Sequence, residues 1–180
     1  NIQGKQDVLS EHGLSFCVET KEHKLLVDCG QTASFIENAN RLQVDLEKID
    51  TVILSHGHYD HSGGILSFTE INPHAKIYLQ KSAVLPYYHK TEDEERYIGI
   101  DPAIKELSQV EFVEEDIMID EELSLFSGVK GRTLWPKGNL ALKKKVGDEF
   151  VQDTFDHEQY LIVTEGEKKV LFSGCAHNGI

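Results

Sequence analysis

Short apolar runs separated by turn residues fill the first third of the chain and predict alternating strands and helices. The runs at 14–18 and 24–27 flank a polar turn, which predicts a β-hairpin. Apolar side chains then recur at helical spacing over 35–42, with Thr32 or Ser34 as the expected N-cap of a helix.

The next part of the chain repeats this alternation. The short apolar run 51–54 has the length and composition of a buried strand. A helix is predicted over 65–71, because a capping segment at 62–64 precedes it and Pro73 follows it. The run 76–79 predicts another strand, and the interleaving of the two element types predicts a mixed α/β fold.

Residues 81–109 are more polar than what precedes them, and we interpret them as a mobile insertion that is partly helical at 103–107. The charged run 92–96 is interpreted as a solvated face. The adjacent Tyr87 and Tyr88 are candidates for the lining of a substrate entrance.

The end of the chain predicts a second hairpin, because the apolar runs 160–163 and 170–172 flank a turn containing Gly166. With 180 residues and 20.3 kDa the chain suits a single domain, 1–180, that carries the insertion. Asn1 is not a natural initiator and the chain ends abruptly at Ile180, so we expect a fragment of a longer protein.

Acidic residues outnumber basic ones 31 to 18, and the formal net charge of -13 excludes several functions. It argues against binding along nucleic-acid phosphates, which needs a basic face, and against docking on anionic lipid. No apolar run approaches the roughly 18–20 residues of a membrane span. Cys17, Cys29 and Cys175 form no CxxC pair, so we expect a reducing, cytoplasmic location without disulfides.

The strongest chemical signal is the run Ser-His-Gly-His-Tyr-Asp-His-Ser-Gly-Gly at 55–64, directly after a predicted buried strand. In an extended chain, side chains two residues apart project to the same side, so His56 and His58 can bind one ion. Asp60 and His61 lie on the next bend and can face a second ion. Imidazole and carboxylate donors suit zinc, and also iron or manganese. The alternative is a hydrogen-bonded histidine turn without metal.

This HxHxDH pattern resembles the signature of the metallo-β-lactamase superfamily. The segments 11–15, 26–30, 55–64 and 172–180 occur in the order of one branch, the metal-dependent hydrolases similar to the dihydropterin ribofuranosylaminobenzene phosphate synthase of methanopterin biosynthesis. The resemblance implies an α/β (α+β) fold, a four-layer αββα sandwich that is incomplete at both ends in this chain. It also implies a dinuclear site at one edge of the two sheets. This site holds two divalent metal ions, and zinc is favoured over iron or manganese.

The resemblance assigns metal ligands position by position. They are His56, His58 and a later histidine for the first ion, and Asp60 and His61 for the second. We choose His177 as the later histidine, with His157 as its competitor. Cys175 is either a thiolate ligand or a small buried residue, and Asp28 is expected to support the histidine loop. Members of the branch continue to a GGxH segment that completes the second site, and this chain stops before it.

The remaining histidines carry no pattern. We interpret His23, His74 and His89 as surface residues, and His12 as a turn histidine rather than a pocket residue.

Three functions compete at this point. The first is a hydrolase of an ester or phosphoester-type small molecule, in which the metals lower the pKa of water towards about 7 and Asp60 receives a proton. The second is a transferase like the synthase of the branch, acting on a phosphorylated or pterin-like substrate. Candidate contacts of such a substrate are Tyr87, Tyr88 and Tyr97 for a ring, and Lys81, Lys90 and Arg96 for a phosphate. The third is a non-catalytic, metal-stabilised binding domain.

Overall fold

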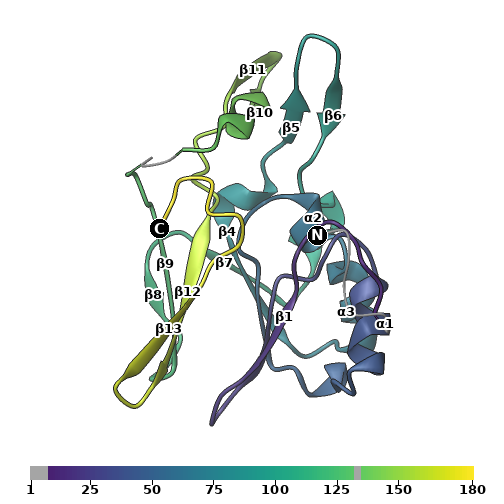
Figure 1. Ribbon diagram of the computed structural model, residues 1–180, viewed down its shortest axis with the longest axis vertical. Helices are drawn as coiled ribbons and strands as arrows, with labels where there is room; N and C mark the ends of the chain where they lie inside the picture. The colour runs from purple at the N-terminus through teal and green to yellow at the C-terminus, as the bar shows by residue number, and fades with distance from the viewer. Residues whose placement is uncertain (1–7, 132–134) are drawn as a thin grey trace.

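The computed structural model describes residues 8–131 and 135–180, and its central element is a five-stranded mixed sheet (Figure 1). In sheet order its strands are β1 (Phe16–Glu19), β2 (Lys24–Val27), β3 (Thr51–Ile53), β4 (Lys76–Gln80) and β7 (Val110–Val113). β1 pairs antiparallel with β2, which confirms the first predicted hairpin, and the other neighbours pair in parallel.

Helices cover one face of this sheet (Figure 1). The α-helices are α1 (Ser34–Arg41), α2 (Tyr59–Ser62) and α3 (Ile65–Ile71), and the 3₁₀-helices are Leu46–Lys48, Lys81–Val84, Pro102–Glu106 and Lys137–Ala141. Leu26 and Val52 of the sheet pack in one cluster with Phe35 of α1 and Phe68 of α3. Burying each such side chain stabilises the fold by about 1.5–3 kcal/mol, which holds both helices on the sheet.

A second, antiparallel sheet packs on the opposite face. Its strands, in order, are β13 (Lys168–Phe172), β12 (Gln159–Glu165), β9 (Leu123–Ser127) and β8 (Ile117–Met118). Leu25 and Val27 point away from the helices and cluster with Leu125 and Leu161 of this sheet. Because side chains alternate along a strand, β2 supplies both cores. The pairing of β12 with β13 confirms the second predicted hairpin.

The layers are therefore helices, sheet and sheet, which are three of the four layers expected of an αββα sandwich. No α-helix of the described residues lies on the outer face of the second sheet (Figure 1).

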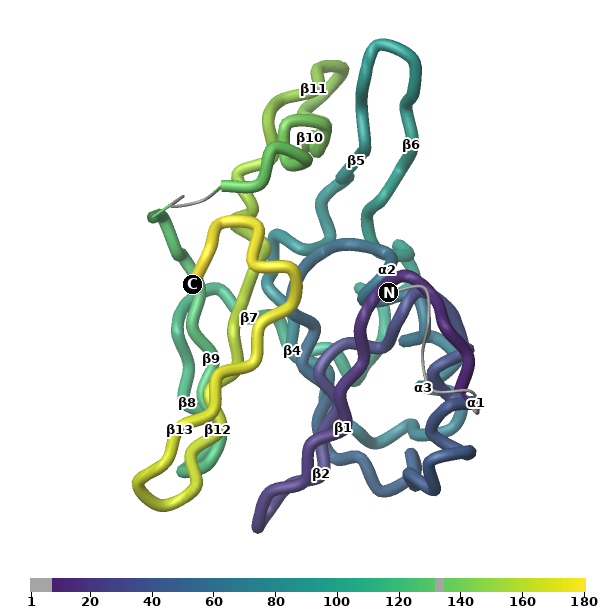
Figure 2. The backbone as a smooth tube through the Cα atoms, in the orientation of Figure 1, coloured from purple at the N-terminus to yellow at the C-terminus, as the bar shows by residue number. Residues whose placement is uncertain are grey.

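The segment interpreted as a mobile insertion contributes to a third sheet that projects from one end of the sandwich (Figures 1 and 2). Its strands, in order, are β11 (Glu149–Gln152), β10 (Leu142–Val146), β5 (Tyr87–Lys90) and β6 (Glu95–Tyr97). The interpretation missed this regular structure, of which β5 and β6 pair locally while β10 and β11 lie more than 40 residues further along the chain. Tyr88 pairs with Tyr97 on one side and with Lys143 on the other. Helical structure within 103–107 is present as the 3₁₀-helix Pro102–Glu106.

The predicted N-cap of α1 was wrong. Ala33 is the N-cap of α1, and the Thr32 hydroxyl accepts a hydrogen bond from the Ser34 amide instead. Gly64, the last residue of the predicted capping segment 62–64, is the N-cap of α3, and the Ser62 hydroxyl donates to the carbonyl of His58 within the preceding helix.

Candidate metal centre

The histidine loop leaves the carboxyl end of β3 and enters α2 at the edge where the two packed sheets meet (Figure 1). Gly57 lies against the Lys81–Val84 helix, and a Cβ atom on it would lie 2.5 Å from the carbonyl oxygen of Ala83. Only glycine permits this approach, which turns His56 and His58 into the interior. Both imidazoles are buried, and their ring centroids are 4.6 Å apart.

The first group of donors consists of His56, His58 and His177, whose ligand atoms lie within 4.8 Å of one another. The Nε2 atom of each is buried and has no hydrogen-bond partner among the described residues. Leaving a buried nitrogen unsatisfied costs about 1–3 kcal/mol, so three converging ones fit a bound cation. Burial, followed by the neighbouring imidazoles, lowers the pKa of His56 and His58 well below the usual value and that of His177 to about 4. The rings are thus neutral and their lone pairs are available to a metal.

Asp28 orients two of the loop histidines, as expected from the sequence. It is fully buried, and its carboxylate accepts hydrogen bonds from the amide and the hydroxyl of Ser55, both at 2.7 Å. Because the Ser55 hydroxyl donates to Asp28, it accepts from Nδ1 of His56 at 2.9 Å. Nδ1 of His61 lies 2.6 Å from the same carboxylate. These bonds direct the Nε2 atoms of His56 and His61 towards the candidate metal centre.

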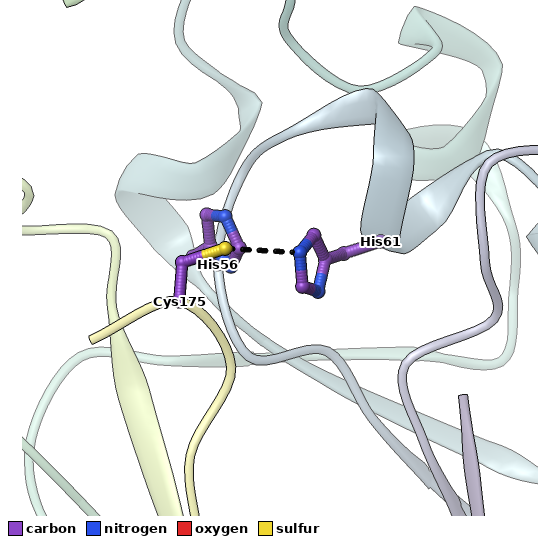
Figure 3. Close-up of side chains that lie close together, drawn as sticks. All are labelled: His56, His61 and Cys175. Carbon is purple, nitrogen blue, oxygen red and sulfur yellow. Dashed lines mark hydrogen bonds between the residues drawn. The ribbon is translucent and has the colours of Figure 1, made fainter. Parts of the chain in front are cut away.

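The second group of donors surrounds His61. Its Nε2 atom lies 3.2 Å from Sγ of Cys175 and 3.6 Å from Oδ2 of Asp60. Figure 3 shows Cys175 reaching His61 and His56 from the segment after β13, while His61 comes from α2. Burial alone would lower the pKa of His61, but the Asp28 carboxylate outweighs it and raises this pKa to about 11. The group combines imidazole, carboxylate and thiol, a donor set that suits zinc.

His157 lies next to the first group, but both of its ring nitrogens have protein partners. Nδ1 accepts the Gly57 amide at 2.9 Å, and Nε2 lies 3.1 Å from the Asp153 carboxylate. It forms a third group with His58 and Asp153, whose ligand atoms also lie within 4.8 Å. In this arrangement His177 presents an unpaired nitrogen to His56 and His58, whereas His157 supports the loop.

Sequence reasoning missed the residues that hold His177. Asn139 of the Lys137–Ala141 helix contacts both its ring and its carbonyl oxygen, at 2.8 and 2.9 Å. Glu158 accepts hydrogen bonds from the amides of His177 and Asn178 at 2.7 and 3.0 Å. Burial raises the pKa of Glu158, and these amide bonds oppose that rise. No local pattern marks either residue, because each lies about 20 or more positions from its partner.

The structure places the three tyrosines proposed to contact a substrate in two different surroundings. Tyr87 is buried, its ring lies 4.1 Å from that of His157, and its hydroxyl donates to the carbonyl of Ser82, so it cannot line an entrance. Tyr88 and Tyr97 contact each other on the projecting sheet, with ring centroids 5.4 Å apart.

The cations proposed to meet a phosphate have protein partners. Lys81 binds Glu114 and Lys90 binds Glu95, both at 2.9 Å. Arg96 reaches the hydroxyl of Tyr59, the residue between His58 and Asp60, at 3.1 Å. Arg96 is thus the one of these three that touches the histidine loop.

His74 is exposed, as expected, but His23 is not a free surface residue. Its two ring nitrogens lie 2.8 Å from Asp50 and 2.5 Å from Asp120, and only 18% of its side chain is exposed. His89 is partly buried and lies 3.2 Å from Glu94.

A loop of converging imidazoles at the edge of two packed sheets defines the class of protein, an α+β sandwich with side-chain groups able to bind a metal. The sequence model of the metallo-beta-lactamase superfamily matches residues 11–179, and the chain belongs to this superfamily. A solved structure described as a metal-dependent hydrolase of the beta-lactamase superfamily is 31% identical, with a TM-score of 0.80 over 97% of this chain and 63% of that one.

Two relatives come from Methanocaldococcus jannaschii. An uncharacterized protein is 33% identical over 95% of this chain and 65% of its own length. The second, named 7,8-dihydropterin-6-methyl-4-(beta-D-ribofuranosyl)-aminobenzene-5'-phosphate synthase, is 29% identical over 95% of this chain and 63% of its own length. The chain thus spans about two thirds of the length of these relatives. Among the described residues, no helix is both long and apolar enough to cross a membrane.

Proposed function

We propose that this chain carries the metal centre of a hydrolase that acts on an ester or phosphoester-type small molecule. The observation that supports this most strongly is the convergence of three buried, unpaired Nε2 atoms, from His56, His58 and His177. Membership of the superfamily and the metal-dependent hydrolase among the similar structures agree with it.

In the proposed centre the two donor groups hold two divalent ions, and zinc is the favoured metal for both. When bound, such ions lower the pKa of water towards about 7 and polarise a carbonyl or phosphoryl oxygen. His56, His58 and His177 hold the first ion as neutral imidazoles, and Asp60, His61 and Cys175 hold the second. Asp60, with 12% of its side chain exposed, receives a proton during turnover.

Hydrolysis assays on metal-depleted and zinc-reconstituted protein test this proposal. We expect turnover of p-nitrophenyl esters or phosphodiesters only after reconstitution, and a loss of at least about 100-fold in a His58→Ala variant. A matched His74→Ala variant removes an exposed imidazole and should keep full activity. An undiminished rate in the metal-depleted protein would exclude the proposed function.

A transferase is the second candidate, because the relative named as a synthase aligns with 95% of this chain. In that case the same ions would stabilise a diphosphate leaving group, and Arg96 contacts the histidine loop through the hydroxyl of Tyr59. Release of inorganic diphosphate that requires an arylamine co-substrate, without hydrolysis in its absence, would favour the transferase over the hydrolase.

A further inference from the structure

One face of the projecting third sheet is turned towards the histidine loop. Side chains alternate along a strand, and directly paired residues of antiparallel neighbours share a face. Tyr87 of β5 therefore lies on the same face as its β10 partner Lys144, and as His89, two residues further along β5. Arg96 of β6 pairs with His89 and belongs to this face too. We call these four side chains the loop-side face.

Two members of the loop-side face reach the candidate metal centre. The ring centroid of Tyr87 lies 4.1 Å from that of His157 and 6.0 Å from that of His58. Arg96 donates to the hydroxyl of Tyr59, the residue that follows His58. Figure 1 shows β5 and β6 rising from the end of the sandwich at which α2 lies. The loop-side face thus lies beside the metal centre.

Lys144 brings a positive charge to this face. It lies directly opposite Tyr87, and paired Cα atoms of antiparallel strands are about 4.5–5.5 Å apart. Its side chain is partly buried, and no ion pair of residues 8–131 and 135–180 involves it. Lys144 therefore places an ammonium group without a counter-charge next to the tyrosine that packs against the candidate metal ligands.

Arg96 adds a second cation that keeps hydrogen-bond donors available. Its Nε atom donates to Glu94 at 3.1 Å, and one terminal nitrogen donates to Tyr59. A guanidinium group has five N–H donors, so these two bonds leave others for a ligand. Half of the Arg96 side chain is exposed, which leaves room for that ligand to approach.

The opposite face of the third sheet is built differently. Tyr88 packs edge-on against Tyr97 and Phe150, with ring centroids 5.4 and 5.1 Å away. The ammonium group of Lys145 lies 5.5 Å from the centre of the Phe150 ring. Lys144 and Lys145 are thus adjacent residues on opposite faces, and only Lys144 belongs to the face beside the metal centre.

Paired cations beside the site favour an anionic ligand, although the chain as a whole has a formal net charge of -13. Fixed charges of one sign raise the local concentration of the opposite ion, and guanidinium and ammonium groups bind phosphate and carboxylate oxygens. We propose that Arg96 and Lys144 bind an anionic group, a phosphate or a carboxylate, on the part of the substrate remote from the bond that is broken. This inference rests on the proposed function, which it narrows to anionic esters.

A pair of matched esters tests the proposal on the zinc-reconstituted chain. p-Nitrophenyl acetate is neutral, and mono-p-nitrophenyl succinate carries a carboxylate at the remote end of its acyl group. Lys144→Gln and Arg96→Gln should each raise the KM for the succinate relative to that for the acetate by at least about fivefold. Lys144→Arg keeps the charge and should retain most of the preference. Lys145→Gln is the matched control, since it removes the same charge from the opposite face, and the ratio should stay as in the wild type.

Two kinetic outcomes would overturn the proposal. A structural role of the two cations would change both esters alike and leave the ratio of KM values unaltered. An effect of net charge alone would appear equally in Lys144→Gln and Lys145→Gln.

Binding to the metal-depleted chain separates this inference from the proposed function. Isothermal titration calorimetry with phenyl phosphate should show at least about fivefold weaker binding to Lys144→Gln than to the wild type and Lys145→Gln. Equal affinities of the two variants, or no binding by the wild type, would overturn the proposal. A reconstituted chain that binds phenyl phosphate in this way but hydrolyses neither ester would instead refute the proposed function.

Discussion

The side chain of Asn139 holds His177 at two points, through the ring Nδ1 atom at 2.8 Å and through the carbonyl oxygen at 2.9 Å. The amide oxygen of Asn139 accepts the Nδ1 proton, so this bond leaves the lone pair of His177 on Nε2. A residue of the segment between the second and third sheets thereby sets the tautomer of a histidine near the end of the chain.

We therefore expect Asn139→Ala to weaken zinc binding at the first donor group by about 10–100-fold, because loss of an orienting partner frees the ring of a ligand. Competitive zinc titration measures this. Asn40→Ala removes an exposed asparagine from α1 and should leave the affinity unchanged. Equal affinities in the two variants would show that Asn139 does not position His177.

The close approach of Gly57 to Ala83 leads to a second prediction, which concerns the stability of the fold. Gly57→Ala should displace the histidine loop and destabilise the fold by about 1–3 kcal/mol, because the new methyl group meets backbone atoms that cannot move independently. Gly138→Ala is the matched control, since a Cβ atom there meets nothing within 4 Å. Urea unfolding of both variants compares them, and similar midpoints would contradict the argument.

The candidate donors of the histidine loop could be named from the sequence because they are local, and their role as metal ligands stays a prediction. His56, His58, Asp60 and His61 lie within six positions, and the short apolar runs around them fixed the neighbouring strands and helices. Asp28 was also anticipated, on the resemblance to the superfamily.

The supporting residues were not predictable in the same way. Asn139 contacts His177, 38 positions away, and His157 accepts a hydrogen bond from Gly57 across 100 positions. A local pattern in the sequence therefore cannot predict either contact. The third sheet was missed for a similar reason. Three consecutive lysines, 143–145, hide the strand β10, whose pairing with β5 and β11 becomes evident only in the folded chain.

Asp50 precedes β3 of the central sheet, and Asp120 lies between β8 and β9 of the second sheet. His23 bridges the two carboxylates, and this bridge should make stability depend on pH. Burial lowers the pKa of His23, but its bonds to the two carboxylates outweigh this effect and raise it above 6.5. The stabilisation from protonated His23 is therefore fully present below pH 6.5 and is lost as the pH rises through the folded-state pKa. The pKa values of Asp50 and Asp120 are lowered, so their contribution is present above pH 3.8 and is lost as the pH falls through their folded-state pKa values.

Urea unfolding of wild type and His23→Gln at several pH values measures this bridge. The free-energy difference between them should be largest between about pH 4 and 6.5 and should shrink in mildly alkaline buffer. His74→Gln should show no such pH-dependent difference. A gap between wild type and His23→Gln that stays constant from pH 5 to 9 would show that His23 acts by packing alone.

Metal binding should also stabilise the fold, because the three Nε2 atoms of the first donor group are buried without a hydrogen-bond partner. At a free zinc concentration 100 times the dissociation constant, a single site adds about 2.7 kcal/mol, which corresponds to a rise in melting temperature of about 5–10 °C for a chain of this size. Thermal unfolding in zinc and in chelator measures the difference. The double variant His58→Ala with His177→Ala removes two of the three nitrogens, so zinc should no longer raise its melting temperature through this group. If zinc raises the melting temperature of the double variant as much as that of the wild type, the stabilising ion binds elsewhere on the chain.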